Sequence, residues 1–367
     1  MKVLQVGKFY PPYVGGMETV LKNLCEALKS KVDIEVLVAN TFFKTLHENS
    51  SFPITRVASI GTFLSCSIAP SFLYWLRNLS GDILHIHIPN PLAELSYLFS
   101  RKKGRMVGHF HSDIVRQKSL LPIYGPFLRL FYERADRIIV PSPNHISVSS
   151  FLPRFRKKCR VIPYGISLGE FELNKSEMET VKKLMEKGCP KLLFVGRLVY
   201  YKGLDVLIRA MREVKAKLWI IGTGPLEQNL RELIAKLGLV EKIEFLGSVD
   251  QRGLVCYYHA CDIFVLPSVA RSEMFGMVQL EAMACRKPVI STNLPTGVSW
   301  VNQHGITGLS LPLGDSSALA KAIQELIDNP HMCEQMGEAG RKRVEETFTI
   351  EKMAAAVFEV YREVLSG

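Results

Sequence analysis

The sequence predicts two doubly wound α/β domains, both Rossmann-like, that face each other across a cleft. The first observation behind this prediction is a repeated opening. The apolar runs "KVLQVGK" at 2–8 and "KLLFVGR" at 191–197 each continue through a loop into an amphipathic helix. The second observation is that more apolar runs of strand length, separated by helical stretches, follow each opening.

The elements follow one another in the order that such domains require. After the first opening come "VDIEVLVAN", "DILHIHIP", "RMVGHFHS" and "ADRIIVPS"; after the second come "AKLWIIGTG", "KIEFLGSV", "CDIFVLPS", "RKPVISTN" and "TGLSLPLGD". The pattern drops into a polar stretch at about 166–175, and an amphipathic helix closes the chain. We therefore place the domains at 1–168 and 169–348 and the closing helix at 349–367.

The positive charge of the chain lies in its first half. The net charge is 46 − 35 = +11; residues 1–170 carry 22 Lys and Arg against 11 Asp and Glu, and the remainder carries 24 against 24. Basic residues gather at 101–105 and 154–160. We find no nucleic-acid-binding module and no alternation of aromatic with basic residues, so an anionic membrane surface is favoured over nucleic acid.

Residues 57–76 form an uncharged stretch long enough to span a bilayer, but Gly61 and Pro70 argue against a spanning helix. Two interpretations stay open: an apolar segment that contacts a membrane, and a buried helix of the first domain. The chain opens on a strand-like run rather than a secretory signal, and its eight cysteines are scattered. These features favour a cytoplasmic protein with reduced thiols.

Two glycine-containing loops follow predicted strands and could bind an anion. In "GRLVYYKG", 196–203, Arg197 and Lys202 lie on one strand-end loop, where two cations suit a pyrophosphate. Gly15 and Gly16 precede a helix, where backbone N–H groups face an anion or simply form a turn. The turn "GTGP" is followed by Glu227 where a dinucleotide fingerprint has its third glycine, which argues against a dinucleotide-dependent enzyme.

The stretch "SEMFGMVQLEAMA", 272–284, holds two acids around a predicted helix start. Glu273 lies before the helix and Glu281 about a turn and a half into it. Carboxylates accept hydrogen bonds from sugar hydroxyls, and the helix start favours an anion. On spacing alone, two ordinary helix acids are the favoured interpretation. Cys256, His259 and Cys261 are spaced like metal ligands, but no second ligand pair follows, so we expect no metal there.

Taken together, these motifs resemble the retaining family-four glycosyltransferases of GT-B architecture, in particular bacterial polysaccharide and O-antigen mannosyltransferases. The resemblance runs along the whole chain. It rests on the "GG" loop, "HFHSD", "GRLVYYKG", "GTGP", "DIFVLPS" and, above all, the two glutamates separated by seven residues in "SEMFGMVQLEAMA", with "PVIST" and "GITGL" behind them. The resemblance implies that the closing helix crosses back to the first domain.

The resemblance also implies roles for matching residues. Glu281 would accept from the ribose of a sugar nucleotide, Glu273 would hold the transferred sugar, and Arg197 with Lys202 would neutralise the pyrophosphate. His111 would lie at the sugar. The backbone groups implied at the donor are those of Gly16, Phe275, Gly276, Met277 and Val278.

The reaction implied is hexosyl transfer with retained configuration, without a cofactor. The acceptor hydroxyl would attack on the face of the departing diphosphate, and domain closure would exclude water. The chain holds no D-x-D motif, so we expect no metal. GDP-mannose or a related GDP-sugar is the preferred donor and a UDP-hexose the second choice. The acceptor would be a lipid-linked oligosaccharide or glycolipid at the inner face of the cytoplasmic membrane.

Three alternatives stay open at this point: an epimerase or phosphorylase on the same fold, a non-catalytic sugar-nucleotide-binding protein, and a dehydrogenase. The sequence also departs from the family pattern in two places. Arg286 stands where many relatives have glycine, so it must adopt a left-handed conformation or end the helix differently. The segment "PTGVSWV" at 295–301 lacks a glutamate that many relatives carry.

Overall fold

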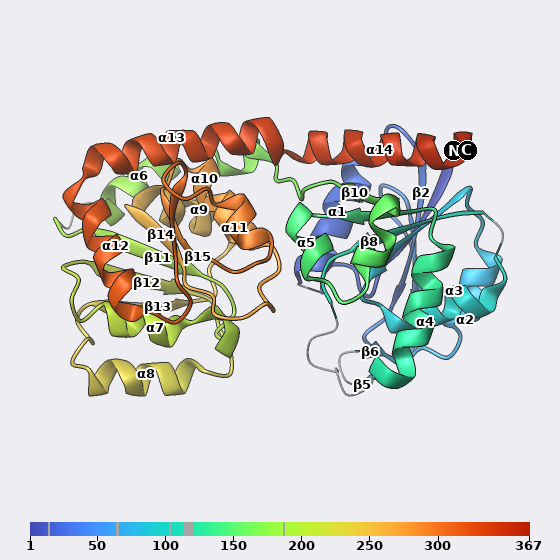
Figure 1. The fold of residues 1–367 in the computed structure, drawn as a ribbon, viewed down its shortest axis with the longest axis horizontal. Helices are drawn as coiled ribbons and strands as arrows, with labels where there is room; N and C mark the ends of the chain where they lie inside the picture. Colours follow the sequence, from blue (N-terminus) through green and yellow to red (C-terminus); the bar gives the residue numbers. More distant parts are fainter. Residues whose placement is uncertain (14, 64–65, 103, 114–120, 186–187) are drawn as a thin grey trace. The chain divides into compact units, whose positions relative to one another are not determined.

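The computed structural model describes the chain except residues 14, 64–65, 103, 114–120 and 186–187. The chain divides into two compact units (Figure 1). Unit 1 comprises Met1–Gly165 and Ile350–Gly367, and unit 2 comprises Ile166–Thr349. The divisions expected from the sequence, after 168 and 348, differ from these by a few residues. Helix α14 (Ile350–Ser366) therefore belongs to unit 1, although it follows unit 2 in the chain.

Unit 1 contains an eight-stranded sheet in the order β10-β9-β8-β7-β1-β2-β4-β3. Every pair is parallel except β3 with β4. The five apolar runs named from the sequence all form strands, whereas β3, β4 and β10 were not expected. The strands are β1 (Lys2–Val6), β2 (Asp33–Ala39), β3 (Leu46–Asn49), β4 (Pro53–Val57), β7 (Ile83–Ile88), β8 (Arg105–Phe110), β9 (Arg137–Val140) and β10 (Cys159–Val161).

Helices pack on both faces of this sheet, as in a doubly wound fold. Helix α14 packs against α1, β8 and β9, and α3 packs against α2, α4 and β7. Two neighbouring residues of β8 illustrate the two faces of the sheet. A side chain at Gly108 would point toward Phe131 of α4, whereas His109 points to the opposite face. The helices are α1 (Gly16–Leu28), α2 (Phe72–Asn78), α3 (Pro91–Ser100), α4 (Leu121–Arg134) and α5 (Pro143–Val148), with the 3₁₀ segment η2 (Leu152–Lys158).

Residues 57–76 are neither wholly buried nor wholly exposed. They include the hairpin of β5 (Thr62–Phe63) and β6 (Cys66–Ser67) and the start of α2. In α2, Phe72 is buried and Tyr74 is exposed. Among the described residues, no helix is both long and apolar enough to cross a bilayer.

Unit 2 contains a six-stranded parallel sheet in the order β13-β12-β11-β14-β15-β16. All six strands coincide with apolar runs named from the sequence. They are β11 (Lys191–Val195), β12 (Lys217–Ile221), β13 (Ile243–Gly247), β14 (Ile263–Leu266), β15 (Val289–Thr292) and β16 (Gly308–Leu311).

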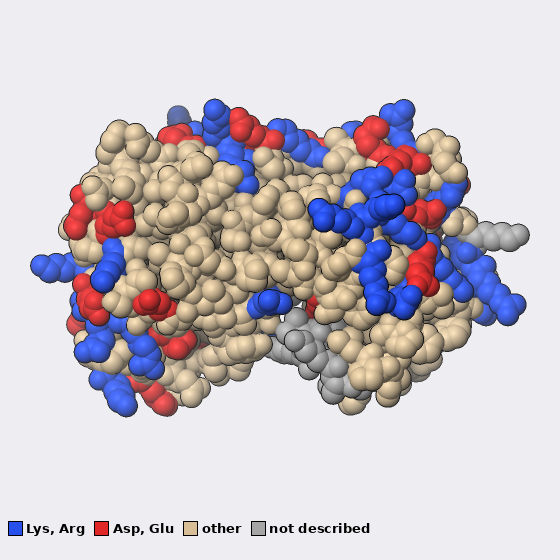
Figure 2. All heavy atoms as spheres, in the orientation of Figure 1, with Lys and Arg blue, Asp and Glu red and all other residues tan. Residues whose placement is uncertain are grey.

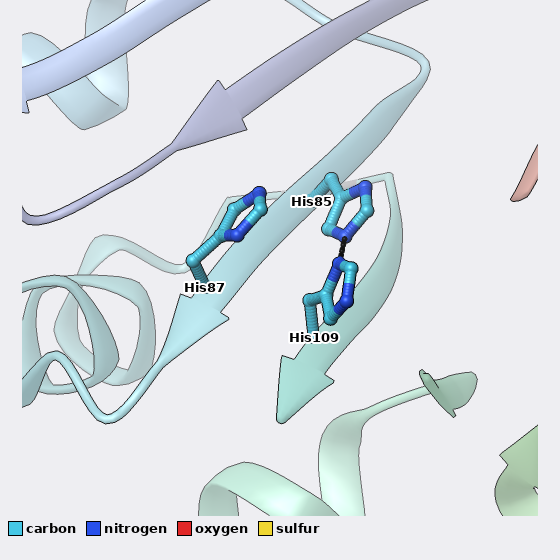
Figure 3. Close-up of side chains that lie close together, drawn as sticks. All are labelled: His85, His87 and His109. Atoms are coloured by element: carbon cyan, nitrogen blue, oxygen red, sulfur yellow. Dashed lines mark hydrogen bonds between the residues drawn. The ribbon is translucent and has the colours of Figure 1, made fainter. Parts of the chain in front are cut away.

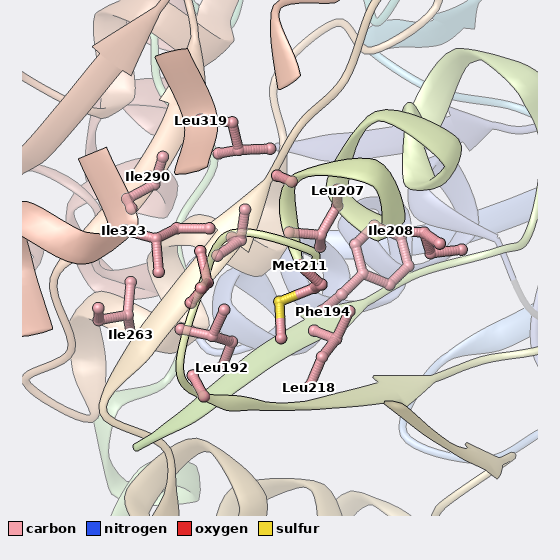
Figure 4. Packing of buried hydrophobic residues seen from close by; sticks show 14 of the residues in the cluster. Leu192, Phe194, Leu207, Ile208, Met211, Leu218, Ile263, Ile290, Leu319 and Ile323 are labelled. Atoms are coloured by element: carbon pink, nitrogen blue, oxygen red, sulfur yellow. The ribbon is translucent and has the colours of Figure 1, made fainter. Parts of the chain in front are cut away.

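One face of the unit 2 sheet packs against α7, α8 and α12, and their aliphatic side chains form a closed core (Figure 4). Phe194, Leu207 and Ile323 in this core are fully buried. The helices of unit 2 are α6 (Lys175–Met185), α7 (Leu204–Ala210), α8 (Glu227–Lys236), α9 (Gln251–Ala260), α10 (Met277–Ala284), α11 (Gly297–Val301), α12 (Ser316–Asp328) and α13 (Pro330–Thr347), with the 3₁₀ segments η3 (Leu168–Phe171) and η4 (Tyr200–Lys202).

Arg286 takes the first of the two conformations expected for it, with a left-handed φ of 56° after α10. Its backbone lies against α13, because a side-chain carbon at Gly337 would fall 2.1 Å from the Arg286 carbonyl oxygen. Its guanidinium pairs with Glu338, Nε to Oε1 at 2.9 Å. The arginine thus keeps a left-handed conformation and lies in close contact with α13.

Candidate active site

The order of strands in unit 2 marks one edge of the sheet as a ligand-binding position. Strand β11 lies between β12 and β14, so the order of connections reverses between β11 and β14. In open parallel sheets, ligands bind beyond the carboxyl ends of the strands at such a switch point. Here those ends lead into Arg197 and into Glu273, two of the residues singled out from the sequence.

The central feature of this edge is an ion pair between Lys202 and Glu273. Lys202 Nζ lies 2.6 Å from Glu273 Oε2, and each side chain is only 10% exposed. The Ser268 hydroxyl, from the end of β14, donates to the same carboxylate oxygen at 3.1 Å. The sequence assigned Lys202 to a pyrophosphate and Glu273 to a sugar, and it gave no sign that the two bind each other.

A glycine allows the loops that carry these two residues to touch. Gly203 has a φ of 66°, and a side-chain carbon on it would lie 2.1 Å from the Pro267 carbonyl oxygen. Beside it, the backbone N–H of Val269 donates to the Tyr201 carbonyl at 2.8 Å. From the other side, the Thr296 hydroxyl donates to the Glu273 carbonyl at 2.8 Å. The Lys202–Glu273 pair is therefore held by backbone contacts, not by the two side chains alone.

Helix α10 begins next to this pair. Its N-cap, Gly276, has a left-handed φ of 75°, and Gln279 Nε2 donates back to the Phe275 carbonyl at 3.3 Å. The first turn, which includes Met277 and Val278, has no intrahelical acceptors for its N–H groups. Those groups and the positive end of the helix dipole favour a bound anion.

Glu281 lies in α10, and the Tyr258 hydroxyl of α9 donates to its Oε2 at 2.8 Å. Burial raises the pKa of Glu281, and the Tyr258 hydrogen bond and the charge of Lys202 oppose that rise. The second carboxylate oxygen, Oε1, has no hydrogen-bond donor among the described residues. The sequence did not identify Tyr258, because it lies 23 residues away on a different helix.

Arg197 differs from Lys202 in its surroundings. Its side chain is exposed, and it has no hydrogen-bond or ion-pair partner among the residues that the structure describes. Lys202, by contrast, is 8% exposed. Of the two cations that the sequence placed on this loop, Arg197 is therefore the one already available to an anionic ligand.

In unit 1, Gly16 is the first residue of α1, and a side chain there would meet nothing within 4 Å. At Gly15 a side-chain carbon would lie 2.2 Å from the Glu18 carboxylate. Burial raises the pKa of Glu18. An anion that approached the start of α1 would therefore meet a carboxyl group beside the open backbone of Gly16.

His111 follows β8 and is buried, with both ring nitrogens in contact with protein groups. Its Nε2 lies 2.8 Å from His87 Nδ1, and its Nδ1 lies 2.6 Å from the Tyr164 hydroxyl. Burial, followed by neighbouring histidines, lowers its pKa well below the ordinary value. A contact between this ring and a sugar would need one of these hydrogen bonds to break.

His111 belongs to a stack of imidazoles on the α14 face of the sheet. His85 and His87 lie on β7, and His109 lies opposite His87 on β8 (Figure 3). The alternation in "HIHI" and "HFH" has the period of two that places side chains on one face, and this signal could have predicted the stack. Within the described residues, His85, His87 and His109 are also the one group with the spacing to hold a metal ion.

The buried histidines predict a loss of stability in mild acid. Burial lowers the pKa of His109 to about 3 and of His145 to about 4, and it lowers the pKa of the other three stacked rings well below 6.5. In the unfolded chain each ring titrates near pH 6.5 and binds a proton that the folded state does not. Each ring therefore makes its full contribution to the free energy of unfolding above pH 6.5. Below pH 6.5 that contribution falls by up to about 1.4 kcal/mol per pH unit for each ring.

Three acids oppose this trend, because burial raises the pKa of Glu94 to about 7 and also raises the pKa of Glu18 and of Glu281. The histidines outnumber them, so we expect the free energy of unfolding to fall by several kcal/mol between pH 7.5 and 5.5. Urea unfolding at both pH values, followed by tryptophan fluorescence, measures this. The exposed His331→Gln variant should keep the same pH dependence, and an unchanged midpoint in wild type would contradict the prediction.

Comparisons with known proteins agree with this architecture. Residues 176–343 match the model of the glycosyl transferases group 1, and residues 14–170 match the model of glycosyltransferase family 4. Among solved structures, a sucrose-phosphate synthase from Thermosynechococcus elongatus has a TM-score of 0.84 at 23% identity and covers 100% of this chain and 99% of its own. Anabaena HepE in complex with UDP has a TM-score of 0.81 at 18% identity, and the match covers 99% of this chain and 100% of the HepE chain.

The two Rossmann-like units and the parallel-sheet site place the protein in the GT-B class of glycosyltransferases. Two curated relatives are closer in sequence. O-antigen chain mannosyltransferase C of Escherichia coli is 31% identical over 100% of both chains, and the D-rhamnosyltransferase WbpZ of Pseudomonas aeruginosa is 34% identical over 94% of this chain and 92% of its own. The chain belongs to the glycosyltransferase family that carries these group 1 and family 4 domains.

Proposed function

We propose that this glycosyltransferase moves mannose or a related hexose from a GDP-sugar to a hydroxyl of a lipid-linked polysaccharide, with retained configuration and without a metal. Two full-length relatives named for mannosyl and D-rhamnosyl transfer support the sugar class. The observation that carries the proposal is the Lys202–Glu273 pair at the switch point, beside the free guanidinium of Arg197 and the start of α10. A UDP-hexose is the second choice of donor.

In this proposal the donor diphosphate takes its place beside Arg197 and Lys202. The Glu273 carboxylate, which contacts Lys202 and Ser268 in the structure, then also accepts from the hydroxyls of the transferred sugar. Backbone N–H groups from Phe275 to Val278 complete the anion site, and the free oxygen of Glu281 accepts from the ribose. When the sugar–phosphate bond breaks, these fixed cations and dipoles stabilise the charge that develops on the leaving diphosphate.

The acceptor oxygen forms its new bond on the face that the diphosphate leaves. The proton of the acceptor hydroxyl passes to the departing phosphate oxygen, so no protein base is required. Glu273 is engaged by Lys202 and Ser268, which suits a binding role better than that of a covalent nucleophile. His111, which the family resemblance assigns to the sugar, would act there as a fixed group, because both of its nitrogens are occupied.

The donor is tested with a panel of nucleotide sugars. We expect GDP-mannose or another GDP-sugar to raise the Tm of the purified chain most and to be hydrolysed slowly without acceptor. Product analysis with a lipid-linked acceptor should give a new glycosidic bond of retained configuration. An isomerised or phosphorolysed donor would support an epimerase or a phosphorylase instead, and binding without turnover across many acceptors would support a non-catalytic protein.

Membrane association is a separate part of the proposal, with the enzyme peripheral at the inner face of the cytoplasmic membrane. On α4, Ile123, Phe127 and Leu130 form an exposed apolar stripe at helical spacing. Phe99 of α3 lies near Phe127, with ring centroids 6.4 Å apart and planes tilted by 52°. Arg101, just after α3, is exposed. An apolar stripe with cations beside it suits the interface of an anionic bilayer.

Basic side chains also gather on the part of Figure 2 that Figure 1 assigns to unit 1. Some residues of the clusters named from the sequence have structural partners instead. Lys102 donates to the Leu76 and Leu79 carbonyls at the end of α2, and Arg105 pairs with Asp136 at 3.1 Å. Arg154 and Lys157 are exposed and remain available to a surface.

Vesicle flotation tests the membrane surface. We expect the chain to float with anionic vesicles at low salt and to be released at high salt, because screening weakens charge attraction at the surface. The double variant Ile123→Ser/Phe127→Ser should lose most of the bound fraction. Val240→Ser, which changes an exposed apolar residue of unit 2, should float like wild type. Absence of binding to anionic vesicles at low salt would remove this part of the proposal.

A further inference from the structure

Gln5 on β1 joins two groups of buried side chains. Its Oε1 lies 3.2 Å from His87 Nε2, and its Nε2 lies 2.9 Å from the Tyr361 hydroxyl of α14. Gln5, His87 and Tyr361 are all fully buried, so water cannot replace these contacts. An amide oxygen only accepts and an amide nitrogen only donates, so Gln5 gives each group a defined direction.

The first group runs from Gln5 toward the end of β8. Because Gln5 Oε1 can only accept, His87 must carry its proton on Nε2. A neutral imidazole has a single N–H, so His87 Nδ1 accepts from His111 Nε2 at 2.8 Å. His111 Nδ1 is then an acceptor, and the Tyr164 hydroxyl donates to it at 2.6 Å. Neutral rings are expected here, since burial lowers the pKa of both histidines well below 6.5.

The second group runs from Gln5 toward the middle of the stack. Gln5 Nε2 donates to the Tyr361 oxygen, so the single Tyr361 proton goes to His85 Nδ1. His85 therefore carries its proton on Nε2 and donates to His109 Nδ1 at 3.2 Å. His109 is left with a proton on Nε2, a buried atom that has no acceptor among the described residues. All seven side chains thus form one chain of hydrogen bonds that point in the same direction.

This pairing also explains why the stack is not arranged as a metal site. The His85 and His87 rings are nearly parallel, with centroids 4.9 Å apart and planes at 12°, and the His85 and His109 planes differ by 19°. Lone pairs of stacked rings lie in near-parallel planes and do not converge on one cation. The His85 and His109 nitrogens face each other at hydrogen-bonding distance instead.

We propose that Gln5 is a positioning residue: its amide sets all four stacked histidines as the Nε2–H tautomer and thereby fixes the His111 side chain just after β8. This inference rests on the proposed function only where it assigns His111 to the sugar side of the reaction. His111 in this state has no free nitrogen, so it acts as a rigid group just after β8 and not as a base. Tyr164 holds this group from the segment after β10.

Histidine tautomers are observable in the full chain without any substrate. Long-range ¹H–¹⁵N correlation spectra of the ¹⁵N-labelled protein at pH 7.5 should show Nε2–H for His85, His87, His109 and His111. Four Nδ1–H tautomers would mean that the Gln5 amide points the other way, and a mixture would mean that Gln5 does not set them. Either result overturns the proposal, whether or not the protein transfers a GDP-sugar.

The variant Gln5→Glu gives a sharper test, because a carboxylate accepts on both oxygens. Tyr361 must then donate to Glu at position 5 and accept from His85, which moves the His85 and His109 protons to Nδ1. His87 and His111 should keep Nε2–H. Unchanged signals for His85 and His109 would contradict the proposal. Because a buried carboxylate can prevent folding, Gln5→Met provides a second route: it should give mixed tautomers at His87 and His111.

Activity then separates positioning from stability. We expect Gln5→Met to lower kcat about tenfold with the donor KM unchanged, because small displacements of a positioned side chain reduce the rate more than binding. The control Tyr361→Phe interrupts the chain beyond Gln5 and should keep both the His111 tautomer and kcat near wild type. If Gln5→Met and Tyr361→Phe lose activity equally, the effect is structural and the positioning role is wrong.

Discussion

Arg197→Ala is expected to lower kcat by about 100- to 1000-fold, the scale of losing one preorganised donor to a developing anion. The same substitution should change the free energy of unfolding by no more than about 0.5 kcal/mol, because the side chain is exposed and has no partner among the described residues. Steady-state kinetics with saturating GDP-sugar and urea unfolding measure the two quantities.

The matched control is Arg212→Ala, which removes another exposed arginine of unit 2, ahead of β12. It should leave both turnover and stability unchanged. Near-normal turnover in a folded Arg197→Ala protein would rule out the phosphate role of this residue. Equal losses in Arg197 and Arg212 variants would point to general charge and not to a local site.

Lys202→Met should affect stability as well as turnover, because it leaves the Glu273 carboxylate buried with only Ser268 as a partner. Removing one member of a buried ion pair costs about 3–5 kcal/mol. Glu273→Gln should have a similar effect from the other side. The double variant Lys202→Met/Glu273→Gln should recover much of the lost stability, since neither charge is then left without its partner, but none of the activity.

Unfolding curves for the four proteins of this cycle give the coupling energy directly. The exposed pair of Arg286 and Glu338 provides the comparison, because breaking it with Glu338→Gln should cost no more than about 1 kcal/mol. Additive losses at Lys202 and Glu273 would mean that their 2.6 Å contact contributes nothing to folding. Turnover in the double variant at wild-type rate would exclude both residues from the reaction.

The sequence predicted the features that depend on local pattern. Strand-length apolar runs followed by glycine located β1 and β11, and helical spacing placed Glu281 inside α10 with Glu273 before it. The family pattern, in which many relatives have glycine at this position, identified Arg286 as unusual, and of the two conformations left open the structure shows the left-handed one, with a φ of 56°. The GT-B fold and the family were likewise correct.

Pairings between distant residues could not be predicted, because no local pattern encodes them. Lys202 and Glu273 are separated by 71 positions, and Gln5 and Tyr361 by 356, so each contact exists only after the sheet order is set. The basic clusters show the same limit. The sequence counts Lys102 as surface charge, whereas its ammonium caps the carbonyls at the end of α2. Charge counts do not reveal which cations are already engaged.

Because α14 belongs to unit 1 but is translated last, it affects the order in which the two units fold during synthesis. Translation proceeds at about 5–20 residues per second, and domains form as their segments emerge. Unit 2, Ile166–Thr349, is complete before α14 leaves the ribosome, whereas the β1–β7–β8 surface must wait for Tyr361 to cover Gln5 and His85. The nascent unit 1 therefore exposes an uncovered imidazole-rich surface for some tens of seconds, an interval in which a holding chaperone would have a defined surface to protect.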